Sequence, residues 1–194
     1  TLLSQDADIL IKNVGINPTR TGVIDILKGM GANLGLENRR FLGQEPVADL
    51  RVRASQLQGG PVDPALVSLA IDEFPALFVA AAAAKGKTRF SGLEELRVKE
   101  SDRIAAMADG LRRLGIEVEE TPDGAVVYGG RFTGGEVESY HDHRVAMSLA
   151  IAGTVADDEV LVCGVDNVDT SFPGFKDLMT SLGADIVAAD GAVQ

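Results

Sequence analysis

An α/β fold made of repeated βαβ-containing units is predicted by three features of this 194-residue sequence. First, three segments share one order of signals: an apolar run and a glycine are followed by a polar loop and an amphipathic run that ends at a second glycine. Second, two stretches rich in alanine and other apolar residues lie between these segments. Third, a hydrophobic fraction of 45% is enough to fill a core. We therefore expect one domain over residues 1–194.

The repeated segments are residues 9–36, 88–119 and 159–188. A β-strand is expected to open each segment and to end at a glycine. A helix is expected next, closed by a glycine in the left-handed conformation, and then a second strand. The glycines that end the strands are Gly15, Gly92 and Gly164. The glycines that close the helices are Gly31, Gly115 and Gly183.

Two further helices are expected between the copies, in "DEFPALFVAAAAAKG" and "DHRVAMSLAIAGTVA". Their apolar residues leave no broad polar face, which predicts helices buried nearly all round over Phe78 to Ala84 and Val145 to Ala152. Residues 40–64 contain several glycines and prolines and residues 128–140 contain several glycines, and we expect both to be connections between strands. Each unit is therefore a βαβ followed by one more strand and an inner helix.

The net charge of the chain argues against some classes of binding partner. Eighteen basic and 29 acidic side chains give a net charge of −11, which argues against nucleic acid or a membrane surface as a partner. The single cysteine, Cys163, cannot form an internal disulfide, and its apolar surroundings predict a buried, unreactive thiol. No apolar run is long enough to cross a bilayer. The chain lacks an initiator methionine, and we expect it to be a fragment of a longer protein.

Two helix starts carry an arginine where the helix dipole favours an anion. Arg103 follows the expected N-cap Ser101 in "LRVKESDR", and Arg144 follows the expected N-cap Asp142 in "YHDHRVAM". The repetition predicts a shared anionic ligand, a phosphate or carboxylate, between the two guanidinium groups. The alternative is that Arg103 pairs with Asp102 or Glu100, and Arg144 with Asp142, as weak surface ion pairs.

Two carboxylates are candidates for proton transfer. Asp72 lies at the start of the first inner helix, where a simple N-cap is the alternative role. Glu100 lies between Lys99 and the helix that begins near Arg103. Because paired carboxylates can give and take protons in turn, the sequence predicts an acid–base site at these helix starts.

The motifs "NPTRTG", "IDE.P", "GLEELRVKESDR", "DHR.AMS" and a late "SFP" occur in this order. Together they resemble the C-terminal half of the 5-enolpyruvylshikimate-3-phosphate synthase (3-phosphoshikimate 1-carboxyvinyltransferase) family, most closely its glyphosate-tolerant bacterial class. The resemblance covers essentially the whole chain. It implies the enolpyruvyl transferase alpha-beta prism, with helices inside and sheets outside, and it implies that this chain is one of the two domains of that fold.

The resemblance also implies a reaction. The family transfers the enolpyruvyl group of phosphoenolpyruvate to the 5-hydroxyl of shikimate 3-phosphate, releasing phosphate, in aromatic amino-acid biosynthesis in the cytoplasm. It uses no metal and no organic cofactor. Asp72 resembles the aspartate that takes the proton of the 5-hydroxyl. Glu100 resembles the glutamate that takes part in proton transfer at the methylene carbon of phosphoenolpyruvate.

The implied substrate-binding residues are Asp72, Lys99, Arg103, His143 and Arg144. Lys99 resembles a lysine that contacts the 3-phosphate, Arg103 and Arg144 resemble arginines that clamp phosphoenolpyruvate, and His143 resembles a histidine lining the same pocket. The implied partners are these two small anions and the missing other domain of the enzyme.

Two positions depart from some members of the family: Glu95 replaces an asparagine and Thr170 replaces a lysine. Two alternatives stay open. One is a related UDP-N-acetylglucosamine enolpyruvyl transferase, in which "RVKESDR" and "DHR" are not expected. The other is a half-site binding or structural domain that has no activity on its own.

Overall fold

The structure of the chain is a computed structural model that describes residues 2–3 and 6–188. Two units follow nearly the same order of elements, with one more strand in the second. The elements of the first are β1 (Asp8–Gly15), α1 (Gly22–Gly29), β2 (Asn33–Leu42), β3 (Glu45–Arg53) and α2 (Phe74–Ala82). Those of the second are β4 (Lys87–Phe90), α3 (Arg103–Arg113), β5 (Val118–Thr121), β6 (Gly124–Tyr128), β7 (Gly135–Glu138) and α4 (His143–Gly153). The third begins with β8 (Val160–Cys163) and continues into α5 (Val168–Ser171) and α6 (Phe175–Ser181).

The sheets of the first two units have the same topology. Both are antiparallel, with the third strand of the unit in the centre: β1-β3-β2 in the first and β4-β6-β5 in the second. In the third sheet β7 pairs with β8 in parallel. The predicted order, βαβ followed by a further strand and a helix, is thus confirmed for the first unit, and the second unit has the same order with the additional strand β7 before its inner helix.

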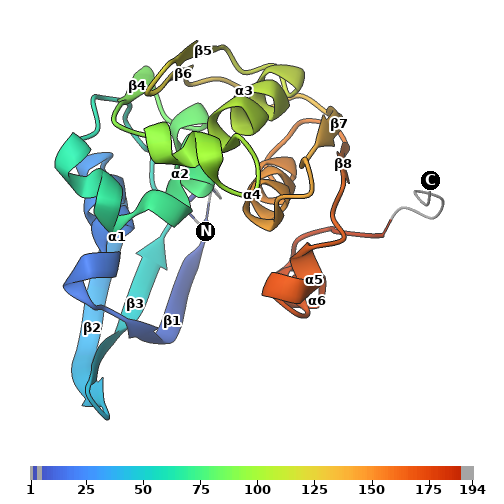
Figure 1. Ribbon diagram of the computed structural model, residues 1–194. Coiled ribbons are helices and arrows are strands. Elements are labelled where there is room, and N and C mark those ends of the chain that lie inside the picture. Colours follow the sequence, from blue (N-terminus) through green and yellow to red (C-terminus); the bar gives the residue numbers. More distant parts are fainter. Residues whose placement is uncertain (1, 4–5, 189–194) are drawn as a thin grey trace.

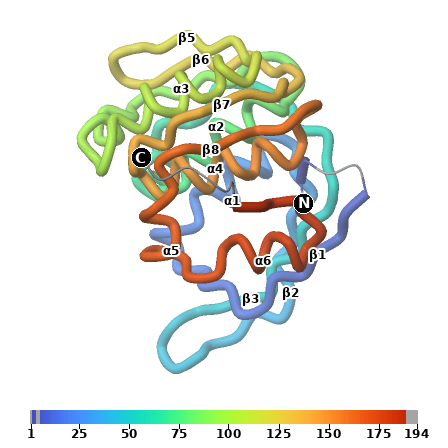
Figure 2. The backbone as a smooth tube through the Cα atoms, turned by 90° about the vertical axis from the view of Figure 1, so that its right-hand side faces the viewer, coloured from blue at the N-terminus to red at the C-terminus, as the bar shows by residue number. Residues whose placement is uncertain are grey.

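The helices α2, α3 and α4 lie inside and the sheets lie outside, as the predicted architecture requires. In Figure 1 the β4-β6-β5 sheet lies above α3, and the β7–β8 pair lies to the right of α4. Figure 2 shows the same order from the side, with β5 and β6 outermost above α3, while the hairpin of β2 and β3 extends away from the body. The inner helix α2 is buried at every position except Ala76. The main core forms around α2, α3 and α4.

The helices of the three segments end in the same way. Gly31, Gly115 and Gly183 all have φ between 81° and 94°. Each donates its N–H to the carbonyl three residues back, and the next residue donates to the carbonyl five residues back. These paired bonds define a Schellman C-cap, which needs a left-handed residue. The three predicted helix-closing glycines are therefore confirmed.

Three predictions about the strands are wrong. The expected connection 40–64 contains β3, and the expected connection 128–140 contains β7. The third segment has no second strand, because residues 184–188 form no regular structure in the part of the chain that is described. A strand needs a neighbour to pair with, and α6 just before it has no buried residue, so this end does not pack on the core.

Cys163 is half-buried rather than buried, which corrects the prediction. It ends β8, and β8 pairs only with β7 in a two-stranded sheet. Burial raises the pKa of the Cys163 thiol, and the nearby carboxylates of Glu136 and Glu138 raise it further. No helix of the described residues has the length and apolar character needed to cross a membrane.

Candidate active site

Three helix starts meet at one carboxylate. Asp72 lies in a short 3₁₀ turn, Ile71–Glu73, immediately before α2. Its Oδ1 is 3.5 Å from Nη1 of Arg103, the first residue of α3, and its Oδ2 is 3.7 Å from Nη2 of Arg144, in the first turn of α4. The side chains of Asp72, Arg103 and Arg144 therefore lie together at these helix starts.

Asp72 is not a helix cap, which sets aside its simplest alternative role. The N-cap of α2 is Glu73, and no side chain hydrogen-bonds to the helix start there. Pro75 lies in the first turn, where its missing N–H costs no helical bond. The Asp72 carboxylate is thus available to the arginines, with 24% of the side chain exposed.

Arg103 is almost completely buried. Only 1% of its side chain is exposed, which corrects the expectation that a site residue facing the missing domain is open to solvent. Its Nε donates to Asp142 at 2.8 Å and its Nη2 donates to Glu100 at 2.6 Å. With Asp72 at 3.5 Å, three carboxylates surround one guanidinium, which accounts for an arginine at the positive end of a helix dipole.

An aspartate caps the N-terminus of both α3 and α4. Asp142 caps α4 as expected, because its Oδ1 accepts from the N–H groups of Arg144 and Val145. Asp102, not the expected Ser101, caps α3 by accepting from Ala105 N at 3.0 Å. Its other oxygen accepts from an arginine of the preceding turn, so of the two alternative partners of Arg103 the structure shows Glu100 and not Asp102.

Asp142 is fully buried. Burial raises its pKa, but the hydrogen bond and the charge of Arg103 lower it, and so do the N–H of Arg144 and the hydroxyl of Ser101. The net pKa lies below the usual value for an aspartate. The side chain therefore carries a negative charge between α3 and α4.

A third arginine reaches Asp72 and was missed by the sequence reasoning. Arg20 Nη2 is 3.6 Å from Asp72 Oδ2 and 3.6 Å from Glu73 Oε1. Arg20 lies two residues before α1, within the motif "NPTRTG". The repeat itself could have identified it, since Arg20 precedes the helix of the first segment much as Arg103 begins the helix of the second.

Lys99 and His143 are less closely tied to this cluster. Lys99 pairs with Glu95, one helical turn before it. His143 is the first residue of α4 and is half-buried. Among the described residues no hydrogen bond joins either side chain to Asp72. Glu100 borders the cluster through Arg103 and keeps 53% of its side chain exposed.

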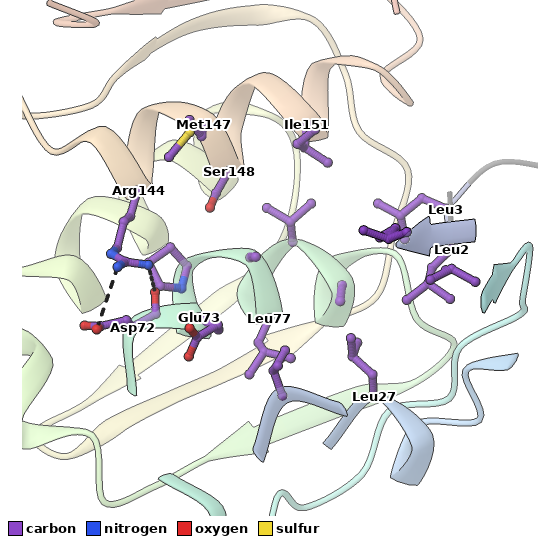
Figure 3. A pocket seen from close by; sticks show the side chains of 17 residues that line it. Leu2, Leu3, Leu27, Asp72, Glu73, Leu77, Arg144, Met147, Ser148 and Ile151 are labelled. Atoms are coloured by element: carbon purple, nitrogen blue, oxygen red, sulfur yellow. Dashed lines mark hydrogen bonds and ion pairs between the residues drawn. The ribbon is translucent and has the colours of Figure 1, made fainter. Parts of the chain in front are cut away.

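An apolar cavity of about 410 Å³ lies beside the cluster. Figure 3 shows Asp72 and Arg144 at one end of it, with Leu2, Leu3 and Leu27 toward the other end. Leucine, valine, alanine and isoleucine side chains make up most of its wall. Such a wall offers no partner for a phosphate or carboxylate, so only the polar end of the cavity is suited to an anion.

The arrangement is suited to an anion rather than to a metal ion. Arg20 and Arg144 are 59% and 33% exposed, and their contacts with the Asp72 carboxylate are longer than good hydrogen bonds. Their guanidinium groups can therefore donate to an incoming anion as well. In the ranges 2–3 and 6–188, no three His, Cys, Asp or Glu side chains are placed to hold a metal ion.

Known proteins with similar sequences cover this chain almost completely. The curated 3-phosphoshikimate 1-carboxyvinyltransferase of Magnetococcus marinus is 56% identical over 185 residues, which is 94% of this chain and 42% of the relative. That of Hydrogenovibrio crunogenus is 52% identical over 97% of this chain and 43% of the relative. The chain thus spans less than half the length of these relatives.

A solved structure shares the fold. The EPSP synthase of Acinetobacter baumannii superposes with a TM-score of 0.92 at 49% sequence identity, covering 94% of this chain and 43% of that one. The family model described as EPSP synthase (3-phosphoshikimate 1-carboxyvinyltransferase) matches residues 2–179. The fold is therefore the enolpyruvyl transferase type. This chain belongs to the EPSP synthase family.

Proposed function

We propose that this chain carries part of the active site of a 3-phosphoshikimate 1-carboxyvinyltransferase. The whole enzyme, called the parent enzyme below, transfers the enolpyruvyl group of phosphoenolpyruvate to the 5-hydroxyl of shikimate 3-phosphate and releases phosphate. The observation that carries the proposal is the meeting of Arg20, Arg103 and Arg144 at Asp72, in a chain of this family. Both substrates are multiply charged anions, and guanidinium groups bind carboxylate and phosphate through paired N–H donors.

The geometry around Asp72 supports the acid–base roles that the family resemblance implies. A hydroxyl that approaches the Asp72 carboxylate lies beside the guanidinium groups of Arg103 and Arg144, and Asp72 is the group that accepts the proton of the 5-hydroxyl. Glu100, held by Arg103 yet half-exposed, is the second proton-transfer group, at the methylene carbon of phosphoenolpyruvate. Separate groups for two proton transfers suit a reaction that adds and then eliminates.

The binding roles are distributed around the same point. Arg144 and the Nη1 edge of Arg103 hold phosphoenolpyruvate, and His143 lines the pocket. Lys99 contacts the 3-phosphate of shikimate 3-phosphate once its ion pair with Glu95 is broken. The exposed guanidinium of Arg20 is a further donor. An anion between these groups would replace the weak contacts of the arginines with Asp72 by shorter, charge-assisted bonds.

The chain corresponds, in this proposal, to the C-terminal portion of the parent enzyme and is closest to the glyphosate-tolerant class. The remaining portion is its main partner, because the relatives are more than twice as long. Since the two phosphorylated substrates do not cross membranes unaided, the enzyme works where they are made, in the cytoplasm.

Phosphate release tests the proposal. The parent enzyme is expected to release phosphate only when phosphoenolpyruvate and shikimate 3-phosphate are both present. The 194-residue chain alone is expected to bind them weakly without turnover, because a half-cleft leaves both anions in water. Absence of turnover by the parent enzyme would disprove the function. Turnover by the isolated chain would disprove the half-site role.

A further inference from the structure

The carboxylate of Asp142 makes two separate sets of contacts. Oδ1 accepts from the backbone N–H groups of Arg144, at 2.9 Å, and of Val145, at 3.4 Å, and so caps α4. Oδ2 accepts from Arg103 Nε, at 2.8 Å, and from the Ser101 hydroxyl, at 3.1 Å. One side chain therefore joins the first turn of α4 to the first turn of α3.

The backbone before Asp142 is held in an unfavourable conformation. Tyr140 and His141 both have positive φ, 55° and 56°, although neither is glycine. Bonds from the surrounding structure hold this turn: the Asp142 N–H donates to the Ser139 carbonyl at 3.0 Å, and the Asn167 amide donates to the His141 carbonyl at 2.7 Å. Two consecutive left-handed residues persist only where the rest of the fold requires them.

The strained turn places Asp142 in a buried position, although a residue that only caps a helix can stay at the surface. A cap can stay at the surface, as Asp102 does with 38% of its side chain exposed. Asp142 instead is fully buried against a guanidinium that is itself 1% exposed. Burying this ion pair costs hydration energy, so a gain beyond capping is expected.

We propose that Asp142 is a positioning residue for the donor substrate, because it fixes the Nε side of Arg103 and so directs the Nη1 edge toward Asp72. This inference rests on the proposed function. With Nε held by Asp142 and Nη2 held by Glu100, the guanidinium plane cannot rotate. The same carboxylate sets the first turn of α4, which carries Arg144. The spacing of two phosphoenolpyruvate-binding arginines thus depends on one side chain that touches neither the donor nor the acceptor.

The variant Asp142→Asn separates the two sets of contacts. Its amide oxygen still accepts from the α4 backbone, while its NH₂ group cannot accept from Arg103. Asp102→Asn is a matched control, because Asp102 also caps a helix with Oδ1, at Ala105 N, and holds an arginine, Arg97, with Oδ2 at 2.7 Å. The control differs in its arginine, since Arg97 lies outside the site, and in the exposure of its carboxylate.

The first readout is steady-state kinetics of the parent enzyme. Asp142→Asn is expected to raise the KM for phosphoenolpyruvate about tenfold or more, while the KM for shikimate 3-phosphate and the kinetics of Asp102→Asn change by less than about threefold. In an Arg103→Lys background, Asp142→Asn is expected to raise the KM for phosphoenolpyruvate further by less than about threefold, because the two residues act through one contact. Additive effects, or equal effects of the two asparagine variants, would overturn the proposal.

The second readout does not depend on catalysis. In the parent enzyme with ¹⁵N-labelled arginine, the Nε–H of Arg103, assigned through Arg103→Lys, is expected to exchange with solvent about tenfold faster in Asp142→Asn and unchanged in Asp102→Asn. Unchanged exchange in Asp142→Asn overturns the proposal even if the enzyme is active. If the wild-type parent enzyme shows no turnover, the proposed function fails, and this measurement alone decides whether Asp142 holds Arg103.

Discussion

Arg144 contacts Asp72 twice, although the two residues are 72 positions apart in the chain. The guanidinium donates to the Asp72 carbonyl oxygen at 3.1 Å and lies 3.7 Å from the Asp72 carboxylate. Because the first bond does not involve the Asp72 side chain, the starts of α2 and α4 stay joined when the carboxylate is changed. The chemistry of Asp72 can therefore be tested apart from its place in the fold.

Asp72→Asn in the parent enzyme is expected to lower kcat by about 10²–10⁴-fold, the range for loss of a general base. The KM for phosphoenolpyruvate is expected to stay level or fall, since a neutral amide competes less for the arginines. Glu73→Gln is the control, because it also removes a carboxylate beside Arg20 and is expected to keep kcat within about threefold. Phosphate release measures both, and an unchanged kcat in Asp72→Asn would remove Asp72 from the mechanism.

Arg103→Ala is expected to destabilise the protein as well as to weaken donor binding. It leaves the buried carboxylate of Asp142 without its counter-ion, which costs about 3–5 kcal/mol of unfolding free energy. Arg131→Ala breaks an ion pair of similar length, 2.7 Å, at a side chain that is 84% exposed, and is expected to cost less than about 1 kcal/mol. Urea denaturation gives both values, and equal losses would contradict the burial of Arg103.

Acid stability is expected to depend on Asp49 in the central strand β3. Hydrogen bonds from the Asn13 N–H, the Asn38 amide and Arg40 hold the pKa of Asp49 well below its usual range, outweighing the effect of burial. Such a group binds a proton more readily in the unfolded chain, so its stabilising contribution is complete above the unfolded pKa of about 3.9 and is lost as the pH falls toward the folded pKa.

The measurement is the unfolding free energy of wild type and Asp49→Asn from pH 7 down to pH 2. Wild type is expected to be more stable at neutral pH, and the difference is expected to shrink below about pH 4. Parallel curves over this range would show that Asp49 has the same pKa in the folded and unfolded chains.

Thr88→Val is expected to stabilise the protein. Thr88 is fully buried in β4, and its hydroxyl has no hydrogen-bond partner among the described residues. Valine has nearly the same shape and favours strands, so removing the unpaired hydroxyl is expected to add about 1 kcal/mol. Thr121→Val in β5 is the control, because its hydroxyl donates to Asp123 at 3.0 Å, and a loss of about 1 kcal/mol is expected. A stability loss in both variants would indicate a partner for the Thr88 hydroxyl.

The sequence predicts well those features of the fold that depend on a few neighbouring residues. Gly31, Gly115 and Gly183 were predictable because a left-handed C-cap needs a residue without a Cβ. The inner helix α2 was predictable because its residues are apolar on every side. The strand β3 was missed because prolines and glycines around it resemble a connection, whereas its pairing with β1 and β2 depends on residues far along the chain.

The sequence identified two of the three arginines that meet at Asp72 but not the contacts that they make. Arg103 and Arg144 were identified because each opposes a helix dipole, a local feature. The burial of Arg103 could not be predicted, since its partner Asp142 is 39 residues away and reaches it through a turn of two left-handed residues. Arg20 was missed for a similar reason, because its contact with Asp72 exists only in the folded chain.

The close packing of α3 on α4, which brings these helix starts together, gives the last prediction. A Cβ at Gly110 of α3 would lie 2.8 Å from Cδ2 of Leu149 in α4, and Leu149 is fully buried and cannot move aside freely. Gly110→Ala is therefore expected to cost about 1–3 kcal/mol through overpacking. At Gly29, in the last position of α1, a Cβ meets no atom within 4 Å, so Gly29→Ala is expected to add up to about 1 kcal/mol through higher helix propensity. Thermal unfolding of both variants measures the difference, and a stabilised Gly110→Ala would mean that α3 and α4 lie farther apart than this packing requires.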